Sequence, residues 1–294
     1  MREYVLKDIK ELSASFNLIV GIKNEKNKFK NTFSELEKYK QKIYYSKDNI
    51  EIYDYEKPII KGYHTKGRTQ HFNIKEVIID NRKKVTTRIR NRVRRLTKEN
   101  FDENSRFITL TFPENIQDIK MANYEFLKFI KRLRYKYGEF RYLAVIEFQE
   151  RGAIHYHMLA DFGYIKQQEI FEIWGHGWVW IKDLLTAKNG KPCDNVAAYL
   201  IKYINKDLFD KRLMGQQAYL RSRNLKEPTV VYENLSQDEL FKKYGLKVDF
   251  KDLTSLLDWG KKQNYFYFNS FMTKENGKCE YMEFNKKRMP LKNN

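Results

Sequence analysis

The sequence predicts an α+β protein built on a ferredoxin-like (split βαβ) antiparallel sheet. Two observations lead to this class. Short apolar runs typical of strands alternate with segments whose apolar residues recur at helical spacing, and their order is β-α-β-β-α-β-α. A chain of 294 residues with 41% hydrophobic residues is also long enough to bury the core that such a sheet needs.

Each element follows from its local pattern. In chain order, the sequence predicts strand 106–112, helix 121–137, strands 140–148 and 154–161, helix 166–174, strand 177–181 and helix 195–205. Pro113 stops the first strand, and Gly138 ends the first helix. The second and third strands flank a turn that contains Arg151 and Gly152. Around this central domain, at 101–230, we expect a basic N-terminal DNA-binding region at 1–100 and a small C-terminal accessory region at 231–294.

The charge indicates a nucleic-acid partner. There are 57 Lys and Arg against 38 Asp and Glu, a net charge of +19, and aromatic residues make up 15% of the chain. Lys and Arg neutralise phosphates, and aromatic rings stack on unpaired bases. No apolar run is long enough to span a membrane, and the two cysteines, Cys193 and Cys279, form no Cys-x-x-Cys pair. We therefore expect a protein of a reducing cytoplasm with no membrane partner.

Much of this charge lies in one segment. Residues 81–98 contain nine Lys or Arg and no acidic residue, and their apolar residues recur at helical spacing. A solvated surface helix is the simple interpretation, but the lack of acidic partners favours a helix that faces nucleic acid. Arg88, Arg92 and Arg95 on this helix, with Arg151 in the turn, are the expected DNA contacts.

A His-x-His pair lies in the strand at 154–161. His155 and His157 project from the same face, because side chains alternate along a strand. Alone, the pair is equally typical of two partly exposed strand histidines. A hairpin that turns at Arg151 places Glu147 opposite His155, which completes a set of two imidazoles and a carboxylate suited to a divalent metal. His176 is a further histidine, and we expect it to lie in a loop.

The last predicted helix carries two tyrosines and two lysines on one face. Tyr199, Lys202, Tyr203 and Lys206 share that face, and the apolar residues of the helix occupy the other. Ordinary surface residues are one explanation of this pattern. The other is chemical, because Lys favours the phenolate and balances phosphate charge. A tyrosine nucleophile beside a divalent metal is suited to attack on a phosphodiester, with a covalent phosphotyrosyl product.

Three segments together resemble the HUH endonucleases that initiate rolling-circle replication of plasmids and single-stranded DNA phages. They are RFITLTF, IEFQERGAIHYHML and AAYLIKYINK, within 105–230. The resemblance implies a nuclease of the Rep type in which His155 and His157, with Glu147, bind Mg²⁺ or Mn²⁺. It places the histidine-bearing hairpin at the centre of the sheet and the nucleophile on the helix that follows. Similarity to two-tyrosine phage initiators makes Tyr199 and Tyr203 both nucleophile candidates, assisted by Lys202 and Lys206.

The resemblance also implies partners. These are single-stranded or hairpin origin DNA and the DNA polymerase of a bacterial host. Because no Gly-x-x-x-x-Gly-Lys-[Ser/Thr] loop is present, unwinding is expected from a host helicase. Three alternatives stay open: a transposase, a relaxase, and a non-catalytic basic DNA-binding protein whose histidines are structural.

Overall fold

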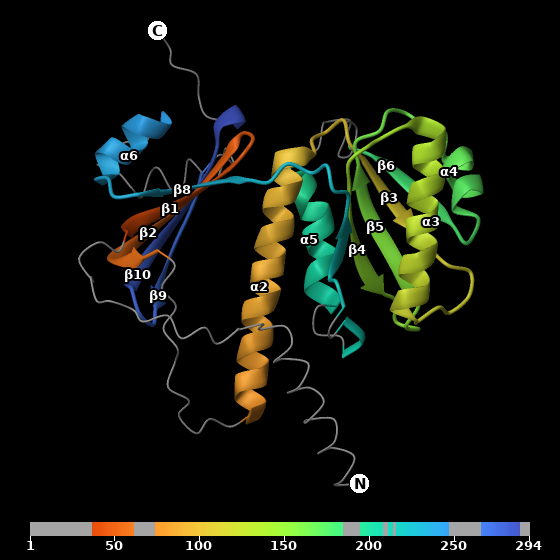
Figure 1. Ribbon diagram of the computed structural model, residues 1–294, viewed down its shortest axis with the longest axis horizontal. Helices are drawn as coiled ribbons and strands as arrows, with labels where there is room; N and C mark the ends of the chain where they lie inside the picture. The colour runs from red at the N-terminus through yellow and green to blue at the C-terminus, as the bar shows by residue number, and fades with distance from the viewer. Residues whose placement is uncertain are drawn as a thin grey trace, which may run out of the picture. The chain divides into compact units, whose positions relative to one another are not determined.

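The structure, a computed structural model, describes residues 37–61, 74–184, 195–207, 211–213, 216–246 and 266–288. Contacts divide the chain into two compact units, Met1–Glu37 and Lys38–Asn294, and every described helix and strand belongs to the second. In these residues, two five-stranded antiparallel sheets are accompanied by several helices (Figure 1). The predicted α+β class is therefore confirmed.

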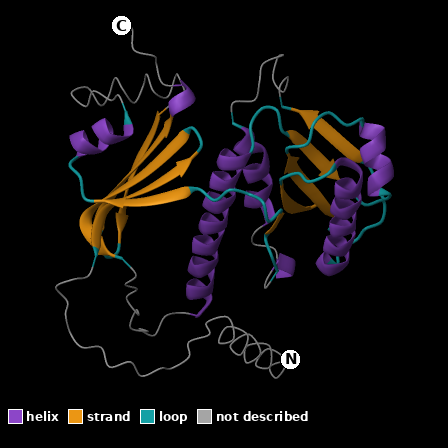
Figure 2. Cartoon of the chain, turned by 45° about the horizontal axis from the view of Figure 1, so that its top comes forward, coloured by secondary structure: helices purple, strands orange, loops and turns teal. Residues whose placement is uncertain are grey.

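The sheet that carries the predicted site comes from the central part of the chain. Its order is β6-β3-β5-β4-β7, and each strand runs antiparallel to its neighbours (Figure 2). The strands are β3 (Arg106–Leu110), β4 (Tyr142–Phe148), β5 (Ile154–Ala160), β6 (Val179–Asp183) and β7 (Tyr219–Arg221). The strand with the two histidines, β5, is thus the middle one.

Helices cover both faces of this sheet. The helices are α2 (Ile74–Asn100), α3 (Ile119–Tyr137), α4 (Gln167–Trp174) and α5 (Val196–Asp207). α3 and α4 bury Phe126, Phe129 and Trp174 against one face. On the other face, α2 and α5 bury residues that include Leu96 and Leu200. Because both faces are covered, nearly all of β4 and β5 is buried, and only Glu147 keeps intermediate exposure.

The seven predicted elements of this domain occur in the predicted order, with ends that differ by a few residues. α3 begins two residues earlier than its apolar pattern indicated. The Asp118 carboxylate explains this start, because it accepts hydrogen bonds from the backbone N–H groups of Lys120 and Met121. At the other end, Gly138 follows the helix with a φ of 81°.

The second sheet combines strands from distant parts of the chain. Its order is β8-β1-β2-β10-β9. The strands are β1 (Lys38–Ser46), β2 (Asn49–Ile60), β8 (Thr229–Glu233), β9 (Phe266–Thr273) and β10 (Gly277–Asn285). Helix α6 (Gln237–Tyr244) packs Leu240 and Phe241 into its core, and two short 3₁₀ turns lie at Lys211–Leu213 and Lys286–Arg288. This sheet therefore pairs strands of the expected N-terminal region with strands of the expected C-terminal region.

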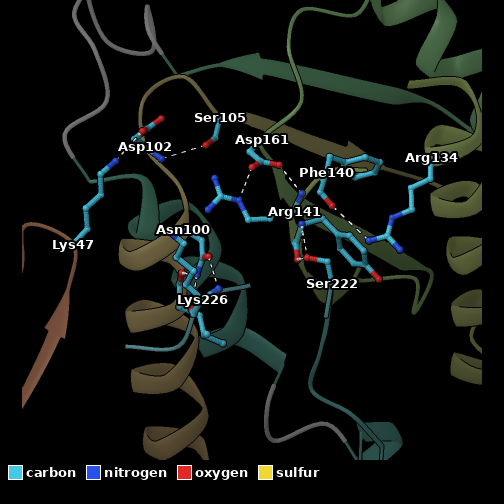
Figure 3. A network of polar contacts seen from close by, with 12 residues as sticks. Lys47, Asn100, Asp102, Ser105, Arg134, Phe140, Arg141, Asp161, Ser222 and Lys226 are labelled. Carbon is cyan, nitrogen blue, oxygen red and sulfur yellow. Dashed lines mark hydrogen bonds and ion pairs between the residues drawn. The ribbon is translucent and has the colours of Figure 1, made fainter. Parts of the chain in front are cut away.

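Polar contacts attach the segment after α5 to the central domain (Figure 3). The Asn100 side chain, at the end of α2, accepts a hydrogen bond from the Lys226 backbone N–H and donates to the Lys226 carbonyl. The Ser222 hydroxyl accepts a hydrogen bond of 3.0 Å from the Tyr142 backbone N–H. These contacts hold β7 at the edge of the sheet beside β4.

Candidate active site

The two histidines lie on the face of β5 that α2 and α5 cover. Tyr156 and Met158 point into the core under α3 and α4, whereas Leu159 points into the core under α2 and α5. Alternation along the strand places His155 and His157 with Leu159. Both histidines are buried, with 9% and 3% of their surfaces exposed. The predicted shared face is confirmed.

Glu147 reaches this face from the neighbouring strand. It is paired with His155 across the hairpin, which is the register predicted for a turn at Arg151. Gly152 in that turn has a φ of 88°, a conformation that glycine adopts without strain. The carboxylate hydrogen-bonds diagonally across the ladder, however, because Glu147 Oε2 lies 2.7 Å from His157 Nε2.

Thr109 holds the other nitrogen of the same ring. It is paired with His157 from β3, and its Oγ1 lies 3.0 Å from His157 Nδ1. A hydroxyl on one nitrogen and a carboxylate on the other fix the orientation of this imidazole. Sequence reasoning missed Thr109. Its one signal was a polar residue inside the apolar strand, at an alternate position from Ile108 and Leu110.

Helix α5 brings Tyr203 onto His157. The two rings stack with centroids 3.5 Å apart and planes 12° apart. Phe107 of β3 lies beside both, with its ring centroid 5.8 Å from His157 and 6.1 Å from Tyr203. The exposed Lys202 has its Nζ 5.5 Å from the centroid of the Tyr203 ring. One nucleophile candidate and one assisting lysine thus lie next to a predicted metal ligand.

The remaining face of α5 is buried as its pattern predicts. Ala197, Leu200 and Ile204 are almost completely inaccessible and pack over the sheet. Tyr199 and Lys206 belong to the same helix, but their side chains lie outside the described residues. The other histidine that the sequence singled out, His176, lies in the loop between α4 and β6, where its Nε2 is 3.2 Å from Glu125 Oε2.

The chemistry of the donors fits a hard divalent cation. Two ligands bound at right angles, each about 2.1 Å from one ion, are about 3 Å apart. The 2.7 Å between Glu147 Oε2 and His157 Nε2 is close to this separation. In the described part of the chain, however, no group of three or more His, Cys, Asp or Glu side chains is placed to hold a metal. The pair fits, and a set that includes His155 is an expectation.

Acidic residues from distant segments pair with much of the basic helix. Arg94 lies 3.0 Å from the buried Glu51, and Arg95 lies 2.8 Å from it. Arg95 also donates a hydrogen bond to the Tyr53 hydroxyl. Arg92 forms an ion pair of 2.7 Å with Glu227. The absence of acids within 81–98 therefore did not leave these charges unpaired, because the fold supplies acids from β2 and from the segment near β8.

The expected DNA contacts consequently differ in their surroundings. Arg88 is exposed, and Arg92 keeps 44% of its side-chain surface exposed beside Glu227. Arg95 is held at the contact of α2 with β2, with 11% of its side chain exposed. Arg151 is exposed in the β4–β5 turn, where its Nε donates to the Gln149 side chain. Arg88, Arg92 and Arg151 are thus the three with substantial solvent access.

The central sheet and its site define an α+β protein in which a histidine, a glutamate and a tyrosine ring meet on one buried sheet face. Residues 105–208 match the family of the replication-associated protein ORF2. The matched part is about a third of the chain and includes every element from β3 to α5. This similarity supports a replication-associated protein of the rolling-circle initiator type. No curated protein and no solved structure matches the chain.

Candidate membrane-crossing segments were sought among the described helices. None of them combines the length and the apolar character that a transmembrane helix requires.

Proposed function

We propose that this protein initiates rolling-circle replication by nicking and rejoining single-stranded origin DNA through a covalent 5′-phosphotyrosine intermediate. The observation that supports this most directly is the stacking of Tyr203 on His157, whose nitrogens are bonded to Glu147 and Thr109. Because the match with replication-associated proteins covers all the elements that carry these side chains, site and similarity point to the same activity.

The arrangement of the strands supports the HUH type. β3, β4, β5 and β6 have the sheet order β6-β3-β5-β4, and α3 and α4 connect them in the manner of a split βαβ unit. We propose a ferredoxin-like core with the β4–β5 hairpin as its central HUH hairpin. In this arrangement α5 is the helix that presents the nucleophile.

We propose Glu147, His155 and His157 as the ligands of Mg²⁺ or Mn²⁺. When bound, the ion supplies Lewis-acid polarisation of the scissile phosphate. Thr109 acts as a positioning residue, because its hydroxyl orients the His157 ring so that Nε2 faces the carboxylate. The Tyr203 ring is held by stacking against His157 and Phe107, which limits its freedom before reaction.

The proposed chemical step is a transesterification. The phenolic oxygen of Tyr203 forms a bond to phosphorus, and the bond from phosphorus to the 3′ oxygen breaks. The phenol loses a proton and the departing 3′ oxygen gains one, so the products are a 5′-phosphotyrosyl bond and a free 3′-hydroxyl. Lys202 stabilises negative charge near the phenol, and we assign Lys206 the same role. Reversal of this step rejoins a strand without ATP.

Tyr199 is the second proposed nucleophile. It precedes Tyr203 by four positions in α5, so the two residues lie one above the other on the helix. One tyrosine would cleave and the other would accept the next strand as a round of replication ends. The 3′-hydroxyl serves the host polymerase, and a host helicase unwinds the duplex in the bacterial cytoplasm. Arg88, Arg92 and Arg151 are proposed to contact the DNA backbone.

A covalent-adduct assay tests this function. Labelled single-stranded oligonucleotides that tile the gene and its flanking DNA are incubated with the protein and Mn²⁺, and the products are separated under denaturing conditions. We expect an adduct that resists denaturation and is absent with EDTA. The double variant Tyr199→Phe, Tyr203→Phe should form none, although it binds the DNA as well as the wild type does. Binding by the wild type with no adduct on any oligonucleotide would instead favour a non-catalytic DNA-binding protein.

The single variants test the two-nucleophile part of the proposal. If either tyrosine can attack, Tyr199→Phe and Tyr203→Phe should each keep part of the cleavage activity. One inactive variant, together with another that both nicks and rejoins at the wild-type rate, would show that a single tyrosine does all the chemistry. A Tyr135→Phe variant on α3 is the matched control, because that ring is 96% exposed and lies outside the site.

A further inference from the structure

Strand β6 has an exposed tryptophan at the edge of the central sheet. Trp180 leaves 69% of its surface exposed, although it lies in the middle of a strand. Exposure of so large an apolar ring is unfavourable for a side chain with only a packing role, and it is typical of rings that bind a partner. Trp178 is also exposed, but its ring contacts Phe171 of α4, at a centroid distance of 6.2 Å.

The register places Trp180 on the face that carries the candidate site. Trp180 is paired with Thr109, and Thr109 is paired with His157 on its other side. Residues paired across neighbouring strands point to the same face of a sheet. The alternate residues Val179 and Ile181 pack instead into the core under α3 and α4. Trp180 therefore lies two strand spacings, or about 10 Å, from His157 along one row of the sheet.

A cation lies on the same face of the same strand. Lys182 follows Trp180 by two positions, so the two side chains project in the same direction, about 7 Å apart. It is paired with Phe107, the ring that lies beside His157 and Tyr203. The surface next to the site thus offers one aromatic face and one positive charge.

We propose that Trp180 is a binding residue that stacks on an unpaired base of the DNA strand entering the site, with Lys182 contacting the adjoining phosphate. This inference rests on the proposed function, because it takes the strand's scissile phosphate to lie at Tyr203. Single-stranded nucleic acid is the occupant that combines a flat apolar face with a regular negative charge, and the protein's net charge of +19 complements it. In duplex DNA the base faces are already stacked, so they are not available to the ring.

Equilibrium binding in EDTA tests the proposal without any cleavage. The probe is a fluorescent 20-nucleotide single strand of mixed sequence, titrated with full-length protein and followed by anisotropy. Stacking of a base on an aromatic ring contributes about 1–3 kcal/mol, so Trp180→Ala should weaken binding about 5- to 150-fold. Trp180→Phe, which keeps an aromatic face, should recover most of the affinity. Tyr135→Ala, which removes an exposed ring from α3, is the matched control and should bind as the wild type does.

Salt dependence separates stacking from charge. The slope of log K against log salt counts phosphate contacts, so it should be the same in Trp180→Ala as in the wild type. In Lys182→Ala the slope should fall in magnitude by about one. For a duplex of the same sequence, Trp180→Ala should leave the affinity unchanged.

Three results would overturn the inference. They are wild-type affinity in Trp180→Ala, equal losses of single-stranded and duplex binding in that variant, and a loss in Trp180→Phe as large as in Trp180→Ala. The first two hold only for variants whose thermal unfolding matches that of the wild type. Failure of the proposed function is a separate outcome, since it appears as the absence of an adduct with Mn²⁺ while the binding differences persist.

Discussion

Replacement of Thr109 by valine tests whether the hydroxyl positions His157. Valine keeps the branched shape that suits a strand and removes the one hydrogen bond of 3.0 Å to His157 Nδ1. The ring then keeps its bond to Glu147 on the other nitrogen, but the orientation of the imidazole is no longer defined from both sides.

The size of the effect follows from the burial of the histidine. With 3% of His157 exposed, its Nδ1 loses a partner in a place that water reaches poorly. An unsatisfied buried polar group costs about 1–3 kcal/mol, so the free energy of unfolding should fall by about this amount. Removal of a group that orients a metal-binding histidine lowers activity or metal affinity about 10- to 100-fold.

The assay is the single-turnover rate of adduct formation over a range of Mn²⁺ concentrations. We expect Thr109→Val to require more Mn²⁺ for its half-maximal rate, and Thr109→Ser, which keeps the hydroxyl, to stay near the wild type. Chemical denaturation of both variants measures the stability loss separately. Wild-type rates in Thr109→Val at every Mn²⁺ concentration would refute the positioning role, and so would an equal loss in the serine variant.

Three further predictions concern stability and reactivity. Phe126→Ala should lower the unfolding free energy by about 3–5 kcal/mol in urea denaturation because the ring is fully buried, whereas the exposed Tyr124→Ala on the same helix should change it by less than about 0.5 kcal/mol. Burial opposes ionisation of Glu283, yet Lys98 and Arg94 hold its pKa below the ordinary 4.5. The stabilisation is thus complete above about pH 4.5 and is lost as the pH falls further, so Glu283→Gln should be less stable than the wild type at pH 7 and should lose less stability on acidification; parallel curves would contradict this. Burial raises the pKa of the Cys279 thiol to about 12, so iodoacetamide at pH 8 should modify Cys279 only after unfolding, as read by peptide mass spectrometry.

Local patterns were sufficient for the central elements. Apolar periodicity predicted β3 through α5 in their observed order, and strand alternation placed His155 and His157 on one face. The register of Glu147 with His155 was also predictable, because a short turn at Arg151 determines which residues of a hairpin face each other. These inferences needed only residues that are close together in the sequence.

Tertiary structure decided the contacts between distant segments. The stacking of Tyr203 on His157 and the bond from Thr109 depend on how α5 and β3 pack against β5. The basic helix appeared free of acidic partners, but Glu51 of β2 pairs with Arg95. Helical and strand periods determine which face of an element a residue occupies, whereas they contain no information on the element that face will meet. The sequence by itself therefore determined the elements and their faces, and only the packing of elements far apart in the chain determined which side chains form the site.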